Sequence, residues 1–271
     1  MVLCWLLLVP NGNFFGREIQ IVWYLLPKAK SLIIVQPPHS LHSNTSRCPN
    51  LHAFLGTGSA GASNTQLNKP WGIAFHPQNK HIIVSDYKNN RLQLFNGQNL
   101  SYFKTIGSLG KEANQFNRPT GVCVQPHSNH IVVCDSMNNR VQLWSDQGVP
   151  ISEPSEGKQC LGRENFNSPC GLCCAPNGSI FVADSNNHRI QIFKDDTSFI
   201  STFGSRGEKK DQFITPFGIS YLDQYYAPSS QASSLLLIAD FGHERISIWS
   251  SDGSQHVTNI AVSDTPRWVW C

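Results

Sequence analysis

The chain has 271 residues, enough for one large domain with a full core. Its net charge of +3 is too weak by itself to indicate nucleic-acid binding. The nine cysteines are odd in number and lie mostly within apolar runs, which argues against a disulfide scaffold and favours reduced thiols in a cytoplasmic protein.

The N-terminal segment, residues 1–50, has no assigned fold. Its first run, "MVLCWLLLVP", is too short to span a bilayer and lacks the basic start of a signal peptide. No membrane role is therefore expected. Glycosylation sequons at Asn44, Asn99 and Asn177 keep secretion open as an alternative.

The domain predicted over residues 51–271 contains an internal repeat of roughly 50 residues. A Pro-x-Gly triplet marks each copy, at Pro70, Pro119, Pro169 and Pro216. Each copy also has an Asp followed five residues later by an Arg. These pairs are Asp86 and Arg91, Asp135 and Arg140, Asp184 and Arg189, and Asp240 and Arg245.

Each copy reads as four short strands. In the first copy they are "GIAF", "HIIVSD", "RLQLF" and "SYFKTIG", separated by Gly, Asn and Pro. Four strands per unit, repeated, predict an all-β protein, a β-propeller of four-stranded antiparallel blades. The four units span about residues 54–107, 108–160, 161–204 and 205–262, and "YYAPSSQASS" reads as a loop inserted in the last.

The combination of Pro-x-Gly, an apolar strand and Asp-x-x-Asn-x-Arg resembles the NHL repeat. Three copies match it well, at residues 70–95, 119–144 and 169–193, whereas the fourth, at 216–249, lacks the paired Asn. The resemblance implies a propeller that binds proteins or RNA, often as the C-terminal part of a ubiquitin ligase. This chain has no RING-like array, so it would supply substrate recognition only.

Two closures of the ring remain open. In one, residues 266–271 form the innermost strand of a fifth blade completed by "IQIVWYLL", "SLIIVQ" and "LHAFLG". In the other, the chain is a fragment of a six-bladed ring.

The repeated Asp and Arg are interpreted as structural. The Asp ends the second strand and can accept donors across the turn. The Arg opens the third strand and could bridge to that Asp or to carbonyls of the next blade. Because a catalytic residue is rarely needed in every blade, we expect each pair, which we call a blade clasp, to hold the architecture.

A binding rim is expected where the loops between units meet the turns after the repeated Asp. Its predicted residues are Trp71, Tyr87, Lys88, Thr120, Ser136, Cys170, Ser185, Phe217 and Phe241. Aromatic side chains with nearby cations suit a protein partner or single-stranded RNA. Acidic residues such as Glu112 interleave with the cations, which favours protein over RNA, and no DNA binding is expected. Alternatively, Trp71 and Phe217 simply plug the mouth of the ring.

An enzyme is the less favoured class, with no catalytic residues assigned. Some NHL-type propellers resemble amidating lyases that hold a metal with histidines, but no three histidines of this chain share one inward position. The cluster "CGLCC" lacks a second Cys/His pair at suitable spacing. No metal and no cofactor are predicted.

Overall fold

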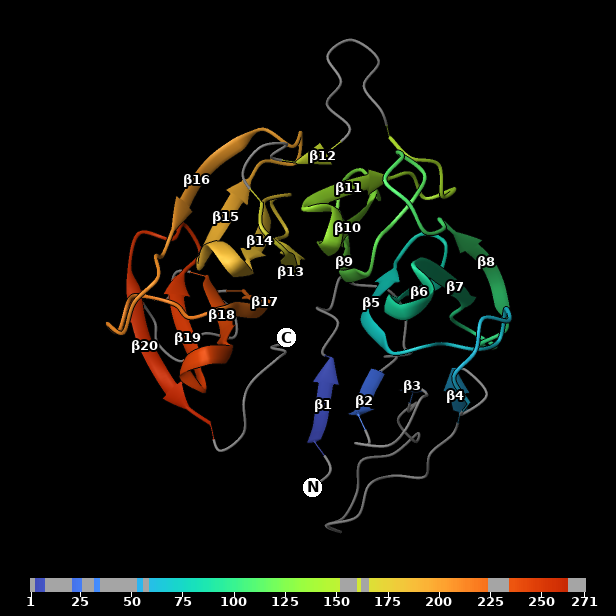
Figure 1. Cartoon of the computed structure of the whole chain (residues 1–271), viewed down its shortest axis with the longest axis horizontal. Helices are drawn as coiled ribbons and strands as arrows, with labels where there is room; N and C mark the ends of the chain where they lie inside the picture. Colours follow the sequence, from blue (N-terminus) through green and yellow to red (C-terminus); the bar gives the residue numbers. More distant parts are fainter. Residues whose placement is uncertain are drawn as a thin grey trace.

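Antiparallel sheets surround a central axis in the computed structural model of the chain (Figure 1). The structure describes residues 3–7, 21–25, 32–34, 53–55, 59–151, 160–161, 166–223 and 234–262. Within these ranges there are strands and short 3-10 turns but no α-helix. The predicted fold class, an all-β propeller, is confirmed.

Four of the sheets have four strands each, and we number these blades in chain order. Blade 1 consists of β5 (Pro70–His76), β6 (His81–Asp86), β7 (Arg91–Asn96) and β8 (Tyr102–Ile106). Blade 2 consists of β9 (Pro119–Val124), β10 (Ile131–Asp135), β11 (Arg140–Trp144) and β12 (Cys160–Leu161). Blade 3 consists of β13 (Pro169–Cys174), β14 (Ile180–Asp184), β15 (Arg189–Phe193) and β16 (Phe199–Phe203). Blade 4 consists of β17 (Pro216–Leu222), β18 (Leu235–Asp240), β19 (Arg245–Ser250) and β20 (His256–Ala261).

The N-terminal strands fill the sector between blades 1 and 4 in Figure 1. β1 (Leu3–Leu7) pairs with β2 (Ile21–Leu25), β3 (Leu32–Ile34) pairs with β4 (Ala53–Leu55), and β2 lies beside β3. The last three strands fall in the runs expected for a closing blade. β1 lies beside β2 at the position where the shared-blade closure would place residues 266–271. Residues 266–271 lie outside the described residues.

The hydrophobic core consists of layers between adjacent blades. The layer between blades 2 and 3 combines Val132 and Leu143 with Leu172, Val182 and Phe193. Equivalent layers join blade 1 to blade 2 and blade 3 to blade 4. Each blade therefore buries both its faces only by stacking on its neighbours.

The glycine of Pro-x-Gly allows the innermost strands to approach one another. A Cβ on Gly121 would lie 2.6 Å from the carbonyl oxygen of Cys170 and 3.0 Å from the Leu172 nitrogen, both in blade 3. A Cβ on Gly72 would likewise approach the carbonyl oxygen of Thr120 in blade 2. A Cβ on Gly171 would approach the carbonyl oxygen of Phe217 in blade 4. The motif thus sets the spacing of the strands that line the axis.

A second contact between blades uses the residue just before the clasp Arg of blades 1, 2 and 3. The Oδ1 atoms of Asn90 and Asn139 accept hydrogen bonds of 2.9 Å from the backbone nitrogens of Arg118 and Ser168 in the next blade. At the junction of blades 3 and 4 a histidine replaces the asparagine, and Nδ1 of His188 accepts from the Thr215 nitrogen at 3.0 Å.

The blade clasps are buried networks centred on the Asp. In blade 2, Asp135 is fully buried and its Oδ2 accepts from Arg140 Nε at 2.7 Å and from Asn138 Nδ2 at 2.8 Å. Its Oδ1 accepts from the Asn117 nitrogen at 2.6 Å, which ties the loop entering the blade to the turn. Asp86, Asp184 and Asp240 have equivalent partners, with His243 in place of the amide in blade 4.

The clasp arginines also hold the loop that enters their own blade. Arg140 donates to the carbonyl oxygens of Lys111, Glu112 and Gln115, and Arg91 does the same along residues 62–66. Two partners were predicted for the Arg, its own Asp or carbonyls of the next blade. Arg91 and Arg140 both bind their own Asp, and their carbonyl partners belong to the incoming loop. A guanidinium group has several N–H donors in one plane, so it can bind several loop carbonyls that lie close together.

Replacing Gly121 by Ala should destabilise the chain by about 1–3 kcal/mol, because the added carbon meets backbone that cannot move aside. Denaturant unfolding of Gly121→Ala measures this. The matched control is Gly61→Ala, whose added carbon would first meet the end of the flexible Gln66 side chain. Equal unfolding midpoints for the two variants would contradict the role assigned to the motif.

Removing the charge of one clasp should cost about 3 kcal/mol, since Asp135→Asn leaves the Arg140 guanidinium without its buried counter-charge. The free energy of unfolding of Asp135→Asn is compared with that of Glu112→Gln, which neutralises an exposed carboxylate. If Asp135→Asn lowers the free energy of unfolding by no more than the control does, the charge of the clasp does not stabilise the fold.

His188 should make the junction of blades 3 and 4 sensitive to acid. Burial and the nearby Arg206 lower the pKa of His188 below 6.5, although Asp240 opposes them. Because the unfolded chain then takes up the proton more readily, stability is lost as the pH falls below about 6.5 toward the folded-state pKa.

His188→Asn keeps a hydrogen-bond acceptor at this position but cannot titrate. We expect its Tm to fall less than that of the parent chain between about pH 7.5 and pH 5. His76 and His81, whose pKa values are also lowered by burial, leave part of the decline in place. An identical decline in both proteins would exclude His188 as a contributor.

Candidate functional site

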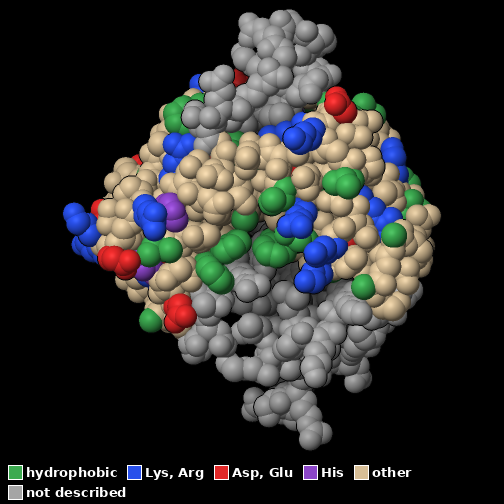
Figure 2. Space-filling model, in the orientation of Figure 1, with side chains coloured by type: hydrophobic (Ala, Val, Ile, Leu, Met, Phe, Trp, Pro, Cys, Tyr) green, Lys and Arg blue, Asp and Glu red, His purple; other side chains and the backbone are tan. Residues whose placement is uncertain are grey.

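Four aromatic side chains form a continuous row at the mouth of the ring. Tyr87 stacks on Trp71 with ring centroids 5.2 Å apart, and Trp71 meets Phe217 at 6.3 Å. Phe217 then contacts Phe241 edge-on at 4.9 Å. We call these four residues the aromatic row. It joins blade 1 to blade 4, and Figure 2 shows hydrophobic side chains gathered at the centre of this face.

The local fold explains why these side chains meet. Trp71 and Phe217 are the middle residues of Pro-x-Gly, at the start of the innermost strands β5 and β17. Tyr87 and Phe241 open the 3-10 turns η1 (Tyr87–Asn89) and η5 (Phe241–His243), directly after a clasp Asp. All four are partly exposed, so the row combines contact within the protein with surface open to solvent.

Basic side chains flank one end of the aromatic row. The Arg118 guanidinium lies 5.7 Å from the Tyr87 ring centroid, a cation–π distance. Lys69 and Lys88 are exposed on the same blade as Tyr87. Of the ion pairs formed between described residues, none includes Lys69, Lys88 or Arg118. These three cations are therefore available to an acidic ligand.

The other predicted rim residues do not present their side chains at the surface. Thr120, Ser136, Cys170 and Ser185 are at most 5% exposed. Ser136 Oγ lies 2.5 Å from both Thr120 Oγ1 and the Pro169 carbonyl oxygen, and Ser185 Oγ donates to the Pro216 carbonyl at 2.6 Å. Small hydroxyls fit between the innermost strands and join adjacent blades, whereas the large rings of blades 1 and 4 do not. For these four residues the expectation of a surface role is wrong.

The histidines and cysteines do not assemble a metal site in the described part of the chain. No group of three or more His, Cys, Asp or Glu side chains converges there. Cys173 and Cys174 are successive residues of β13, so they face opposite sides of the blade and pack in different core layers. The spacing of "CGLCC" therefore does not bring its sulfurs to one point.

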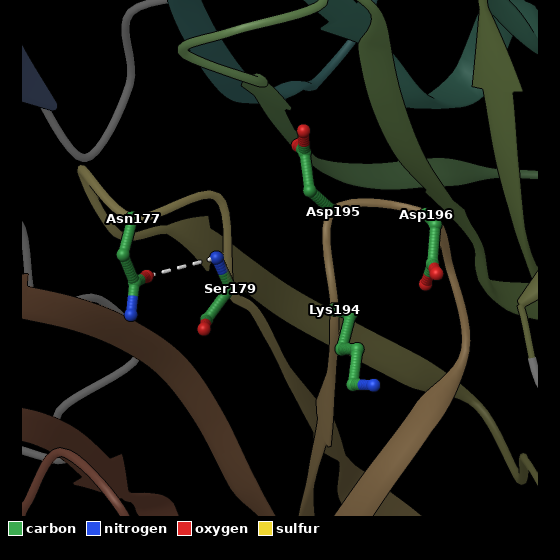
Figure 3. Close-up of a pocket in the computed structure, with 5 residues that line it drawn as sticks. All are labelled: Asn177, Ser179, Lys194, Asp195 and Asp196. Carbon is green, nitrogen blue, oxygen red and sulfur yellow. Dashed lines mark hydrogen bonds between the residues drawn. The ribbon is translucent and has the colours of Figure 1, made fainter.

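A polar depression of about 430 Å³ lies at hairpin ends of blade 3. Asn177, Ser179, Lys194, Asp195 and Asp196 line it, and Asn177 Oδ1 accepts from the Ser179 nitrogen at 3.0 Å (Figure 3). It contains none of the predicted rim residues.

Among the described residues, no helix has the length and hydrophobicity needed to cross a membrane.

Comparison with known proteins places the repeat in a family. The NHL repeat model matches residues 67–95, 116–143 and 166–193. Protein brain tumor of Drosophila melanogaster is 41% identical over 51 residues, which are 19% of this chain and 5% of that protein. The match thus spans about a twentieth of that relative's length.

Solved structures with a similar fold include a chain of the nidogen/laminin complex, with a TM-score of 0.59 and 16% identity, covering 74% of this chain and 68% of that one. A chain of hydrazine synthase from Kuenenia stuttgartiensis has a TM-score of 0.51 and 14% identity, covering 76% and 53%. At such identities the likeness shows the fold alone. The chain thus contains three NHL repeats within a β-propeller fold.

Proposed function

We propose that the chain is a non-enzymatic interaction module that binds a protein partner through the aromatic row and the cations Lys69, Lys88 and Arg118. The observation that carries this proposal is the row itself, four partly exposed rings in contact across two blades. These seven residues replace the nine predicted ones as the binding rim.

The chemistry of the binding rim favours a protein segment with an apolar anchor and nearby carboxylates. Aromatic and Arg side chains dominate the binding energy of protein interfaces, because they bury large areas at a small entropic cost. The rings already support one another, so little ordering is needed on binding. The unpaired cations add charge complementarity and would steer an acidic segment toward the rim.

A wider role follows from the family rather than from the rim. NHL propellers often provide substrate recognition in ubiquitin-ligase pathways, and we propose that role for this chain in the cytoplasm. The described cysteines Cys134 and Cys170 are buried thiols, which suits a reducing compartment. Ligase activity would have to come from a partner or from another part of a longer protein.

Single-stranded RNA is the second candidate for the same rim. Bases stack on exposed rings, and phosphates pair with Lys and Arg, which is the combination present at Tyr87 and Arg118. The exposed acidic residues Glu112, Glu208 and Asp211 on the connecting loops weaken this alternative, because they repel a phosphate backbone.

Replacing Trp71 and Phe217 together by Ala should reduce partner capture from cell extract by about tenfold or more while the chain stays folded. Quantitative mass spectrometry of the captured proteins measures the loss, and circular dichroism checks folding. The matched control is Phe199→Ala, which removes an aromatic ring that is 57% exposed on β16. Unfolding of the double variant would instead support a plug that stabilises the ring.

A labelled pool of single-stranded RNA, titrated across a salt series, separates the two ligand classes. For a protein-binding rim we expect weak RNA binding that does not depend on Trp71 and Phe217. Tight binding that weakens steeply with salt and is lost in the double variant would favour RNA instead.

A further inference from the structure

Two cysteine sulfurs meet at the junction of blades 2 and 3. The Sγ atoms of Cys123 and Cys174 lie 2.7 Å apart, although the residues are 51 positions apart in the sequence. Cys123 lies in β9 and Cys174 ends β13, so the contact joins the innermost strands of two neighbouring blades. Both side chains pack against the core layer between these blades.

The other described cysteines have different surroundings. Cys173 packs in the next core layer, because successive strand residues face opposite sides. Cys134 Sγ lies 4.0 Å from the Gly171 carbonyl oxygen, and Cys170 Sγ lies 3.4 Å from that of Ser168. Both of these therefore have carbonyl partners.

We propose that Cys123 and Cys174 form a reversible disulfide that joins β9 to β13 when the chain meets a peroxide. A disulfide bond is about 2.05 Å long, so the two sulfurs need to move by less than about 1 Å. Both residues are partly exposed, but the Cys123 thiol itself is buried, so only a small oxidant is expected to reach it.

The reaction with a hydroperoxide balances without a cofactor. One thiolate attacks the terminal peroxide oxygen, the O–O bond breaks, and the cysteine becomes a sulfenic acid as the alcohol leaves. The second thiol displaces the hydroxyl as water and forms the S–S bond. Two electrons pass from the sulfurs to the peroxide, and both thiol protons end in the alcohol and water. Two equivalents of a small thiol reverse the bond by exchange.

The environment makes this bond slow to form. Burial raises the pKa of the Cys123 thiol well above 9.0, and the neighbouring Cys174 raises it further. Since the thiolate is the reactive form, the rate should keep increasing as the pH rises through and beyond the ordinary thiol range. A buried cross-link of this kind would respond to sustained oxidation rather than to brief exposure.

The disulfide is independent of the proposed binding rim. Cys123 is four residues beyond Pro119 along β9, away from the strand end where the rim lies. Partner capture and disulfide formation can therefore be measured separately, and failure of either does not imply failure of the other.

The test treats the full chain with hydrogen peroxide, blocks remaining thiols, and maps the digested peptides by mass spectrometry. We expect a linked pair of peptides containing Cys123 and Cys174, two hydrogens lighter than the reduced pair. The oxidised chain should melt about 5–10 °C higher than the reduced chain, because the link constrains the unfolded state. Dithiothreitol should return the Tm to its original value.

Single cysteine variants show which residues form the disulfide. Cys123→Ala and Cys174→Ala should each abolish it, whereas Cys173→Ala, the chain neighbour that faces the next layer, should retain it. The proposal is overturned if both thiols of the parent chain remain open to alkylation after peroxide treatment, or if Cys123 links to another cysteine. Because the parent chain alone gives this answer, a variant that fails to fold does not obscure it.

Discussion

The buried carboxylate of each blade clasp fixes three segments of the chain at once. In blade 2, Asp135 holds the entering loop through the Asn117 nitrogen, the turn through Asn138, and the third strand through Arg140. Arg140 then binds three more carbonyls of the loop. A fully buried charge requires hydrogen-bonding partners, and this requirement orders the loop, the turn and the strand that supply them. The turns that carry Tyr87 and Phe241 depend on it.

Much of the fold was predictable because the determining residues are local. Pro-x-Gly marks the innermost strands, and the spacing of Asp86 and Arg91 makes them direct partners in one hairpin. The positions of Trp71, Tyr87, Phe217 and Phe241 on one face follow from that register. Their mutual contact does not, because Trp71 and Phe217 belong to blades 1 and 4 and meet only through the curvature of the ring.

The inward direction of Thr120 and Ser136 also could not be predicted from the sequence. These residues occupy the same repeat positions as Trp71 and Tyr87, and only the small space between innermost strands decides that a hydroxyl enters it while a ring stays outside. The contact of Cys123 with Cys174 has the same origin, since it depends on the register between two sheets that share no hydrogen-bonded ladder.

The residue before each Pro-x-Gly proline has a left-handed backbone, with φ between 51° and 56° at Lys69, Arg118, Ser168 and Thr215. At Arg118, Ser168 and Thr215 the backbone nitrogen donates a hydrogen bond to a side chain of the preceding blade. The contact that fixes this conformation is therefore made by the backbone of the residue. The side chain at this position takes no part in that hydrogen bond, and four different residue types, Lys, Arg, Ser and Thr, occupy it. The ring thus separates its scaffold from its surface chemistry. One position per blade can change charge or size without rebuilding the frame, so new ligand preferences can arise by single substitutions around the mouth.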